Sequence, residues 1–135
     1  MERTRMERTG VSATLNDVTR AVLGAAIDVH RALGPGLLES AYEACLVYEL
    51  QARGLRVERQ VPQTVRYKAM LIDCGYRIDL LVEDQVVVEF KTVHRILPVH
   101  EAQLLSYLKL SGRPVGLLIN FRVTLLRDGI RRFVH

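Results

Sequence analysis

The sequence is poor in cysteine and contains no long apolar run. Its two cysteines, Cys45 and Cys74, form no C-x-x-C motif, so this chain alone does not supply a four-cysteine zinc or iron–sulfur site. We interpret them as reduced, partly buried thiols, which favours a cytoplasmic location. No stretch approaches the roughly 20 apolar residues that a membrane-spanning helix needs. Segment 1–10 is polar and charged, unlike a secretory signal.

The composition is that of a globular protein with a core of its own. Of the 135 residues, 49% are hydrophobic and 25% are charged, and a chain of this length normally forms one domain. We expect residues 1–13 to form a frayed tail, in which Met-Glu-Arg-Thr occurs twice, and residues 14–135 to form a single domain. The net charge of +4 permits binding to phosphate backbones but does not demonstrate it.

The order of helical and strand patterns indicates an α/β protein of the α+β type. Three segments carry apolar residues at helical spacing, the first with Asn16 or Asp17 as its cap; they cover residues 17–33, 37–53 and 99–111. Extended segments follow the rules for strands; they cover residues 56–65, 67–72, 74–82, 86–92 and 115–121, and a C-terminal hairpin of 125–127 and 130–134 turns at Asp128-Gly129. The order α-α-β-β-β-β-α-β-β predicts a mixed central sheet flanked by helices.

The hairpin formed by residues 74–82 and 86–92 has two distinct faces. A turn at residues 83–85 places six apolar side chains on one face, because strand side chains alternate; they are Ile78, Leu80, Val82, Val86, Val88 and Phe90. The other face carries three opposed pairs, which are Leu81–Val87, Asp79–Glu89 and Arg77–Lys91. A slip of one residue would reverse both faces, so the pattern supports this register.

Asp79 and Glu89 are like charges directly opposite each other, about 5 Å apart at Cβ. Such a pair is destabilising unless a positive charge offsets it, and a hard cation such as Mg²⁺ or Mn²⁺ takes carboxylate oxygens as ligands. Lys91 points to the same face, where its ammonium can hold a water or stabilise charge on phosphorus. A solvated face with diagonal ion pairs, Arg77 to Glu89 and Asp79 to Lys91, would use the same residues. The hairpin alone leaves both interpretations open.

Three motifs occur along the chain in a specific order. Residues 36–42 read G-x-x-E-x-x-Y, Asp79 precedes Glu89-Phe90-Lys91 as in D…E-x-K, and residues 103–107 read Q-x-x-x-Y. Together they resemble the GxxExxY protein family, a branch of the PD-(D/E)XK nuclease superfamily, in which RecB-type nucleases carry the last motif. The resemblance covers roughly residues 15–134, with Ile78 in place of the proline in the superfamily's name. It implies a restriction-endonuclease-like core.

The resemblance also implies a catalytic set and a metal. That set comprises Glu39, Asp79, Glu89 and Lys91. Asp79 and Glu89 resemble the acids that bind Mg²⁺ or Mn²⁺, Glu39 resembles the glutamate that completes or orients the metal site, and Lys91 resembles the catalytic lysine. The backbone carbonyl of Phe90 is a further candidate ligand. The implied activity is hydrolysis of phosphodiester bonds in DNA or RNA.

The third predicted helix carries the remaining candidates that border the site. Gln103 and Tyr107 resemble helix residues that contact nucleic acid, and His100 shares their stripe at positions i, i+3 and i+7. The opposite stripe is expected to supply core contacts through Leu104, Leu105 and Leu108. Because a polar stripe is commonly just a solvated face, lining a cleft and facing solvent are both open to these three residues.

Simpler roles exist for several other candidates. Glu39 lies in the first turn of its helix, where an acid favours the helix dipole. His30 resembles a metal ligand of some RecB-type sites, although a helix-terminal histidine stabilised by the dipole is the commoner case. Tyr42 is interpreted as a packing residue. The C-terminal hairpin carries Arg127, Arg131 and Arg132. They either contact phosphates or form a solvated edge that blocks strand pairing.

The sequence thus predicts a metal-dependent nuclease whose partner is nucleic acid. A homodimer is a reasonable arrangement for a small nuclease that faces duplex DNA. Two alternatives stay open: a non-catalytic nucleic-acid-binding or protein-interaction module on the same fold, and a structural protein whose charged hairpin face is merely solvated. The arrangement of the carboxylates of Glu39, Asp79 and Glu89 discriminates between them.

Overall fold

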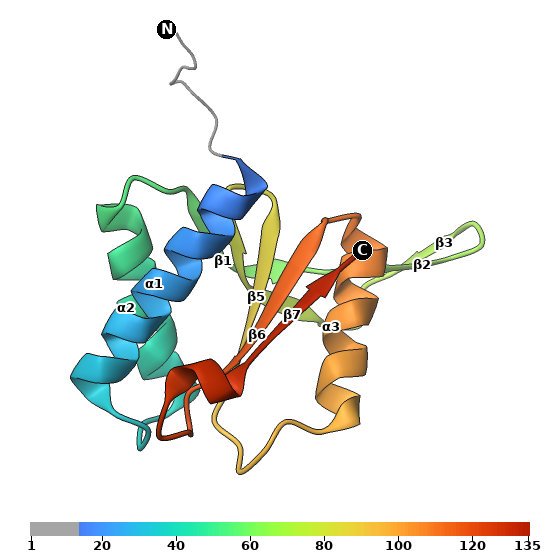
Figure 1. The fold of residues 1–135 in the computed structure, drawn as a ribbon. Helices are drawn as coiled ribbons and strands as arrows, with labels where there is room; N and C mark the ends of the chain where they lie inside the picture. Colours follow the sequence, from blue (N-terminus) through green and yellow to red (C-terminus); the bar gives the residue numbers. More distant parts are fainter. Residues whose placement is uncertain (1–13) are drawn as a thin grey trace, which may run out of the picture.

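The computed structural model describes residues 14–135, and the predicted tail over residues 1–13 lies outside this range (Figure 1). The helices of the described range are α1 (Leu15–Leu33), α2 (Glu39–Ala52), α3 (Pro98–Ser111) and the short 3₁₀ helix η1 (Leu126–Gly129). Its strands are β1 (Val57–Pro62), β2 (Val65–Tyr67), β3 (Met70–Ile72), β4 (Arg77–Val82), β5 (Val86–Lys91), β6 (Val115–Asn120) and β7 (Ile130–Val134). Within residues 14–135, no helix combines the length and the apolar composition needed to span a membrane.

Five strands form one mixed sheet in the order β1-β4-β5-β6-β7. Strands β5 and β6 are parallel, and the other neighbours are antiparallel. Helix α3 connects β5 to β6, as a parallel pair requires, because its strands cannot be joined by a tight turn. Strands β2 and β3 pair only with each other and form a separate hairpin. The mixed sheet flanked by helices confirms the predicted fold class, which is consistent with a restriction-endonuclease-like core.

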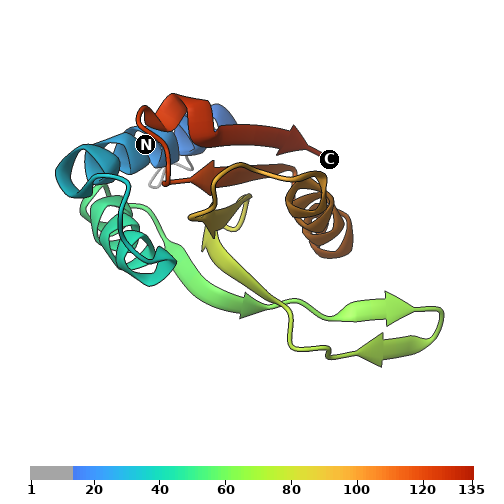
Figure 2. The ribbon, with the colours of Figure 1, turned by 90° about the horizontal axis from the view of Figure 1, so that it is seen from below.

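The helices cover opposite faces of the sheet (Figures 1 and 2). Helices α1 and α2 lie together on one face, and α3 lies on the other. The core is therefore split into two clusters. The first joins α1 and α2 to sheet residues that include Leu80, Val88 and Phe90. The second joins Leu104 and Leu108 of α3 to the other side of the sheet.

Two helix starts differ from the predictions. Helix α1 is capped by Thr14, whose side chain accepts a hydrogen bond from the backbone N–H of Asp17 at 3.1 Å, so the cap is neither Asn16 nor Asp17. Helix α2 begins at Glu39 rather than at residue 37. The segment before it is held away from helical geometry, because the Tyr42 hydroxyl donates to the Gly34 carbonyl at 2.5 Å and accepts from the backbone N–H of Leu37 at 3.1 Å.

The predicted C-terminal hairpin was wrong. Residues 126–129 form η1, and β7 instead pairs antiparallel with β6, with Val134 opposite Val115 and Ile130 opposite Ile119. The tight turn at Asp128-Gly129 is a helical turn packed on the end of β6. Local turn chemistry suggested a hairpin, but the open edge of the buried strand β6 offered a longer pairing.

Gly129 is required by this packing, and we expect Gly129→Ala to lower the free energy of unfolding by about 2–3 kcal/mol. A Cβ at this position would overlap the backbone carbonyl oxygen of Asn120 and lie 3.1 Å from Val123 Cγ2. Gly24 in α1 is the matched control, since a Cβ there meets nothing within 4 Å. Gly24→Ala should raise stability by about 0.5–1 kcal/mol. Urea unfolding measures both values, and equal effects of the two variants would contradict this packing.

Candidate functional site

Strands β4 and β5 pair as predicted at their turn and separate at the two acids. The register joins Leu80–Val82 to Val86–Val88, which confirms the predicted alignment over these three pairs. At Asp79, which precedes Leu80, and at the residues after Val88, hydrogen bonds between backbone and side chain replace the backbone pairing of the two strands. The backbone N–H of Asp79 donates to Glu89 Oε2 at 2.8 Å, and the backbone N–H of Phe90 donates to Asp79 Oδ2 at 2.8 Å. Each carboxylate is thereby fixed between the strands.

The separation of the strands also overturns one detail of the predicted faces. Ile78 packs in the second core cluster with Leu81 and Val87, and not with Leu80 and Phe90 in the first. The alternation that places residues 78 and 80 on one face assumes regular pairing. The pairing of β4 with β5 begins only at Leu80, so it does not include Ile78. The other five apolar residues of the predicted face lie together in the first cluster.

Burial makes the charged form of this acid pair unfavourable. Glu89 is only 5% exposed. Burial, and next the charge of Asp79, raise the pKa of Glu89 to about 8. Burial likewise raises the pKa of Asp79, although the hydrogen bond from the Phe90 backbone acts in the opposite direction. Two carboxylates that are hard to ionise together form a site that favours a proton or a cation between them.

This geometry contradicts the alternative interpretation, in which the hairpin face is solvated and carries diagonal ion pairs. Neither diagonal ion pair forms among the described residues; Arg77 instead lies 4.0 Å from Asp73. Lys91 is half-buried and forms no ion pair with a described carboxylate. Its charge nevertheless lowers the pKa values of Asp79 and Glu89. The ammonium is thus near both acids without being tied to either.

Helix α2 brings further acids to the same place. Partial burial raises the pKa of Glu39, while the charge of Lys91 and a hydrogen bond from the Thr92 backbone lower it. These causes indicate that Glu39 lies near the end of β5, but Glu39, Asp79 and Glu89 are not grouped closely enough for the three carboxylates to hold one metal ion, so the metal role of Glu39 stays a prediction. Glu43 is buried, and it accepts hydrogen bonds from Arg59 Nε at 3.1 Å and from Gln60 Nε2 at 2.8 Å.

Sequence reasoning missed Glu43 and Gln60. Glu43 follows Glu39 by four residues, so the helical repeat was a signal that both carboxylates share one face. Gln60 gave no such signal. Its backbone has φ of 50°, a left-handed conformation that is strained for a residue other than glycine. Its side-chain amide donates to Glu43 and, at 3.4 Å, to Asp79 Oδ1. Gln60 thereby joins α2 to β4 at the acids.

The three residues predicted on α3 do not lie together: Gln103 and Tyr107 contact each other near the acids, and His100 lies at the start of the helix. Tyr107 is buried in the second core cluster, and its pKa is raised by burial and then by the charges of Glu89 and Asp79. Gln103 Nε2 donates to the Tyr107 hydroxyl at 3.3 Å. His100 instead accepts from the backbone N–H of Leu97 at 2.9 Å and caps the start of the helix. The expected stripes are therefore shifted.

The shift moves one polar residue inward and one apolar residue outward. Tyr107 belongs to the core, whereas Leu105, which was expected there, is exposed. A tyrosine ring supplies apolar contacts while its hydroxyl reaches a polar partner, so its position could not be assigned from polarity alone.

An aromatic stack lies under the separated strands. The rings of Tyr42 and Phe121 are stacked with centroids 4.3 Å apart, and those of Phe90 and Phe121 are 5.8 Å apart. Phe90 is the middle residue of the E-x-K motif, and Tyr42 is the last residue of G-x-x-E-x-x-Y. The stack therefore confirms the packing role of Tyr42 and ties together the elements that carry Glu39, Glu89 and Lys91.

Comparison with known proteins identifies the superfamily of this chain. The family model described as PD-(D/E)XK nuclease superfamily matches residues 16–133. This chain belongs to the PD-(D/E)XK nuclease superfamily. No curated protein and no solved structure gave a match. The matched range includes both core clusters and every acid described above.

Nucleases of the PD-(D/E)XK superfamily generally use divalent metals, and the donor atoms of this chain fit such an ion. Among residues 14–135, no three His, Cys, Asp or Glu side chains are grouped to hold a metal. Asp79 and Glu89 each commit one oxygen to a backbone N–H, which leaves Glu89 Oε1 and the weakly bonded Asp79 Oδ1. Carboxylate oxygens supplemented by water and substrate phosphate are the usual ligands of Mg²⁺.

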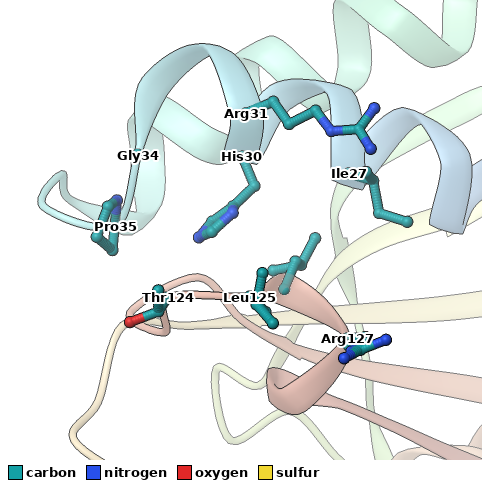
Figure 3. A pocket seen from close by; sticks show the side chains of 9 residues that line it. Ile27, His30, Arg31, Gly34, Pro35, Thr124, Leu125 and Arg127 are labelled. Atoms are coloured by element: carbon teal, nitrogen blue, oxygen red, sulfur yellow. The ribbon is translucent and has the colours of Figure 1, made fainter.

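His30 lies at a different place from the acids. Its Nε2 is 2.8 Å from the Val123 carbonyl oxygen, and its ring lies 6.2 Å from that of Phe121. It lines a pocket of about 530 Å³ between the end of α1 and the chain before η1 (Figure 3). The pocket is lined by Ile27, His30, Arg31, Gly34, Pro35, Thr124, Leu125, Leu126 and Arg127. None of the predicted acids is among them, and a metal role for His30 stays a prediction.

The predicted cluster of C-terminal arginines is split. Arg127 lines the pocket beside His30. Arg131 lies 4.0 Å from Glu101 of α3, whereas Arg132 lies beside α1. Neighbouring residues of β7 point to opposite faces of the sheet, so a shared phosphate-binding patch does not form.

Proposed function

We propose that this protein is a divalent-metal-dependent nuclease of the GxxExxY branch that hydrolyses phosphodiester bonds in DNA or RNA. The observation that carries the proposal is the pair of carboxylates formed by half-buried Asp79 and buried Glu89, each of which accepts a hydrogen bond from a backbone N–H of the facing strand. Fixed, desolvated and mutually repelling acids with a lysine beside them suit a divalent cation and a phosphate group.

Each residue of the proposed site has a separate task. Asp79 and Glu89 would hold Mg²⁺ or Mn²⁺, with the Phe90 carbonyl and Glu39 as further ligands directly or through water. When bound, the ion supplies polarisation of the phosphate and activation of a water nucleophile. The Lys91 ammonium would stabilise the negative charge that grows on the phosphoryl oxygens.

The residues around the acids would orient the site and line it. Gln60 and Glu43 hold β1 and α2 against Asp79 through their hydrogen bonds. Tyr107 lies near Asp79 and Glu89, where its hydroxyl, held by Gln103, can contact nucleic acid. His100 lies in the first turn of the same helix.

Three broader features complete the proposal. Residues 14–135 would act as one catalytic domain. The protein would work in the cytoplasm, which its free cysteines support, since Cys45 is half-buried and Cys74 is exposed without a disulfide. A homodimer would match the two strands of a duplex substrate.

The test is a turnover assay on labelled DNA and RNA. With Mg²⁺ or Mn²⁺ the wild-type protein should release shorter products, and EDTA should stop the reaction. Metal titration by calorimetry should show binding to the wild-type chain. Salt-sensitive binding of nucleic acid without cleavage or metal binding would instead identify the non-catalytic module, and no binding at all would contradict both functions.

A further inference from the structure

The hairpin of β2 and β3 (residues 65–72, called the arm) extends beyond the rest of the protein (Figures 1 and 2). Its strands pair in the register Val65–Ile72, Arg66–Leu71 and Tyr67–Met70. Within residues 14–135 the arm packs mainly against itself, and no other element joins its strands in a sheet. An isolated two-stranded hairpin is marginally stable in water, so a partner would stabilise it.

The arm exposes large apolar side chains. By register, Val65, Tyr67, Met70 and Ile72 share one face. At the outer end of that face, Tyr67 is 57% exposed and Met70 is 56% exposed. On the opposite face Leu71 is 62% exposed beside Arg66. Exposed large apolar side chains occur elsewhere on the protein as well, but here three of them lie together on one short projecting element, as in a contact surface.

The arm is also positively charged throughout. Residues 65–72 contain Arg66 and Lys68 and no acidic residue. Neither cation forms an ion pair with a described residue. Lys68 occupies the turn with φ of 54°, and its ammonium lies 5.4 Å from the centre of the Tyr67 ring. The arm therefore presents two uncompensated positive charges around an aromatic side chain, which complements a polyanion.

The root of the arm adjoins the acids. The backbone N–H of Gln63 donates to the Tyr76 carbonyl at 2.9 Å and closes the base of the hairpin. The Tyr76 ring is edge-on to the Tyr107 ring, 6.2 Å away. Strand β4 then reaches Asp79 three residues after Tyr76. A molecule held along the arm would pass directly by the proposed active site.

We propose that the arm binds in the major groove of duplex DNA and holds it across the acids. This inference rests on the proposed function and names its substrate class. A two-stranded ribbon fits the B-form major groove, which is about 12 Å wide. The major groove of duplex RNA is too narrow and deep for side chains to read. Arg66 and Lys68 reach the phosphates on either side, while Tyr67 and Met70 contact base edges and sugars.

Affinity measured by fluorescence anisotropy in EDTA, where no cleavage occurs, tests the arm. Arg66→Gln combined with Lys68→Gln should weaken binding of a 30-base-pair DNA duplex about tenfold and reduce the slope of log K against log salt by about 2. The matched control is Arg20→Gln with Arg31→Gln, two exposed charges on α1, a helix that lies away from the arm in both views (Figures 1 and 2). It should leave the affinity within twofold.

A second variant separates apolar contact from charge. Tyr67→Ser with Met70→Ser should weaken duplex binding about fivefold without changing the salt slope, because no phosphate contact is lost. A duplex RNA of the same sequence should bind wild-type protein at least tenfold more weakly than the DNA. Thermal melting should show that both double variants keep the wild-type fold, since the arm lies outside the two core clusters.

Several results would contradict the proposed role of the arm and leave the proposed nuclease activity standing. The first is an equal loss of DNA affinity in the arm and control variants. The second is tighter binding of duplex RNA than of duplex DNA. The third is cleavage by the wild-type protein together with a DNA affinity that the arm substitutions do not change. A dimer that Tyr67→Ser and Met70→Ser convert to monomers, with DNA affinity unchanged, would assign the arm to self-association instead. Absence of cleavage together with arm-dependent DNA binding would overturn only the proposed catalysis.

Discussion

Lys91→Met should lower the rate constant of phosphodiester hydrolysis at saturating substrate by a factor on the order of 10²–10³. The methionine keeps most of the volume of the lysine stem and removes the charge. In the structure Lys91 lies near Glu39, Asp79 and Glu89 and is not held in an ion pair with a described residue, so its ammonium is available to a phosphoryl oxygen. Stabilisation of charge that develops only in the transition state affects the rate more than the binding of substrate.

The measurement needs both kinetics and affinity. Single-turnover cleavage gives the rate constant, and anisotropy in EDTA gives the affinity for the same substrate. Lys109→Met is the control, because Lys109 is an exposed lysine in the last turn of α3. It should cleave at the wild-type rate. If Lys91→Met cleaves as fast as Lys109→Met, the assigned role of Lys91 is wrong.

Glu89→Gln should raise the free energy of unfolding at pH 8 by up to about 5 kcal/mol relative to wild type without metal. The pKa of Glu89 is raised from 4.5 to about 8, so the folded protein keeps a proton that the unfolded chain releases. Stability linked to this group is fully present below pH 4.5 and is lost as the pH rises to about 8. Glutamine does not ionise, and its amide oxygen can still accept from the Asp79 backbone.

Urea unfolding between pH 4.5 and pH 9 measures the effect. The two proteins should converge toward the acidic end and separate as the pH rises. Glu58→Gln is the control, since Glu58 is exposed on β1, and it should change stability by no more than about 0.5 kcal/mol at any pH. Millimolar Mg²⁺ or Mn²⁺ should stabilise the wild type more at pH 8 than at pH 5.5, because protons compete for the same oxygens. A wild-type profile parallel to that of Glu89→Gln would contradict the burial assigned here.

Periodicity predicted the parts of this fold that are set by neighbours along the chain. The turn after Val82 and the apolar alternation predicted the register of β4 and β5, because a slip of one residue would expose the apolar face. The same alternation predicted Asp79, Glu89 and Lys91 as site residues, although the observed pairing of β4 with β5 does not extend to them. Ile78 was misplaced because the acids interrupt the backbone pairing, and nothing in an alternating pattern reveals where pairing stops.

The unpredicted parts depend on contacts between distant segments. Gln60 reaches Glu43 across 17 residues and Asp79 across 19, and no local pattern reports such meetings. Strand β7 pairs with β6 and not with the strand predicted over residues 125–127. This pairing depends on the open edge that β6 offers once the sheet has formed. Tyr107 was predicted to lie on a polar stripe with His100 and Gln103, although its ring belongs to the core.

The aromatic stack beneath the motif residues has a consequence for how the sequence of this protein can change over generations. The ring of Phe90 is buried, and it lies between Glu89 and Lys91, the two side chains to which the proposed function assigns metal binding and catalysis. Substitutions that change the packing of this stack should therefore also move Glu89 and Lys91. The arm lies outside both core clusters, so substitutions there should leave the positions of Glu89 and Lys91 unchanged.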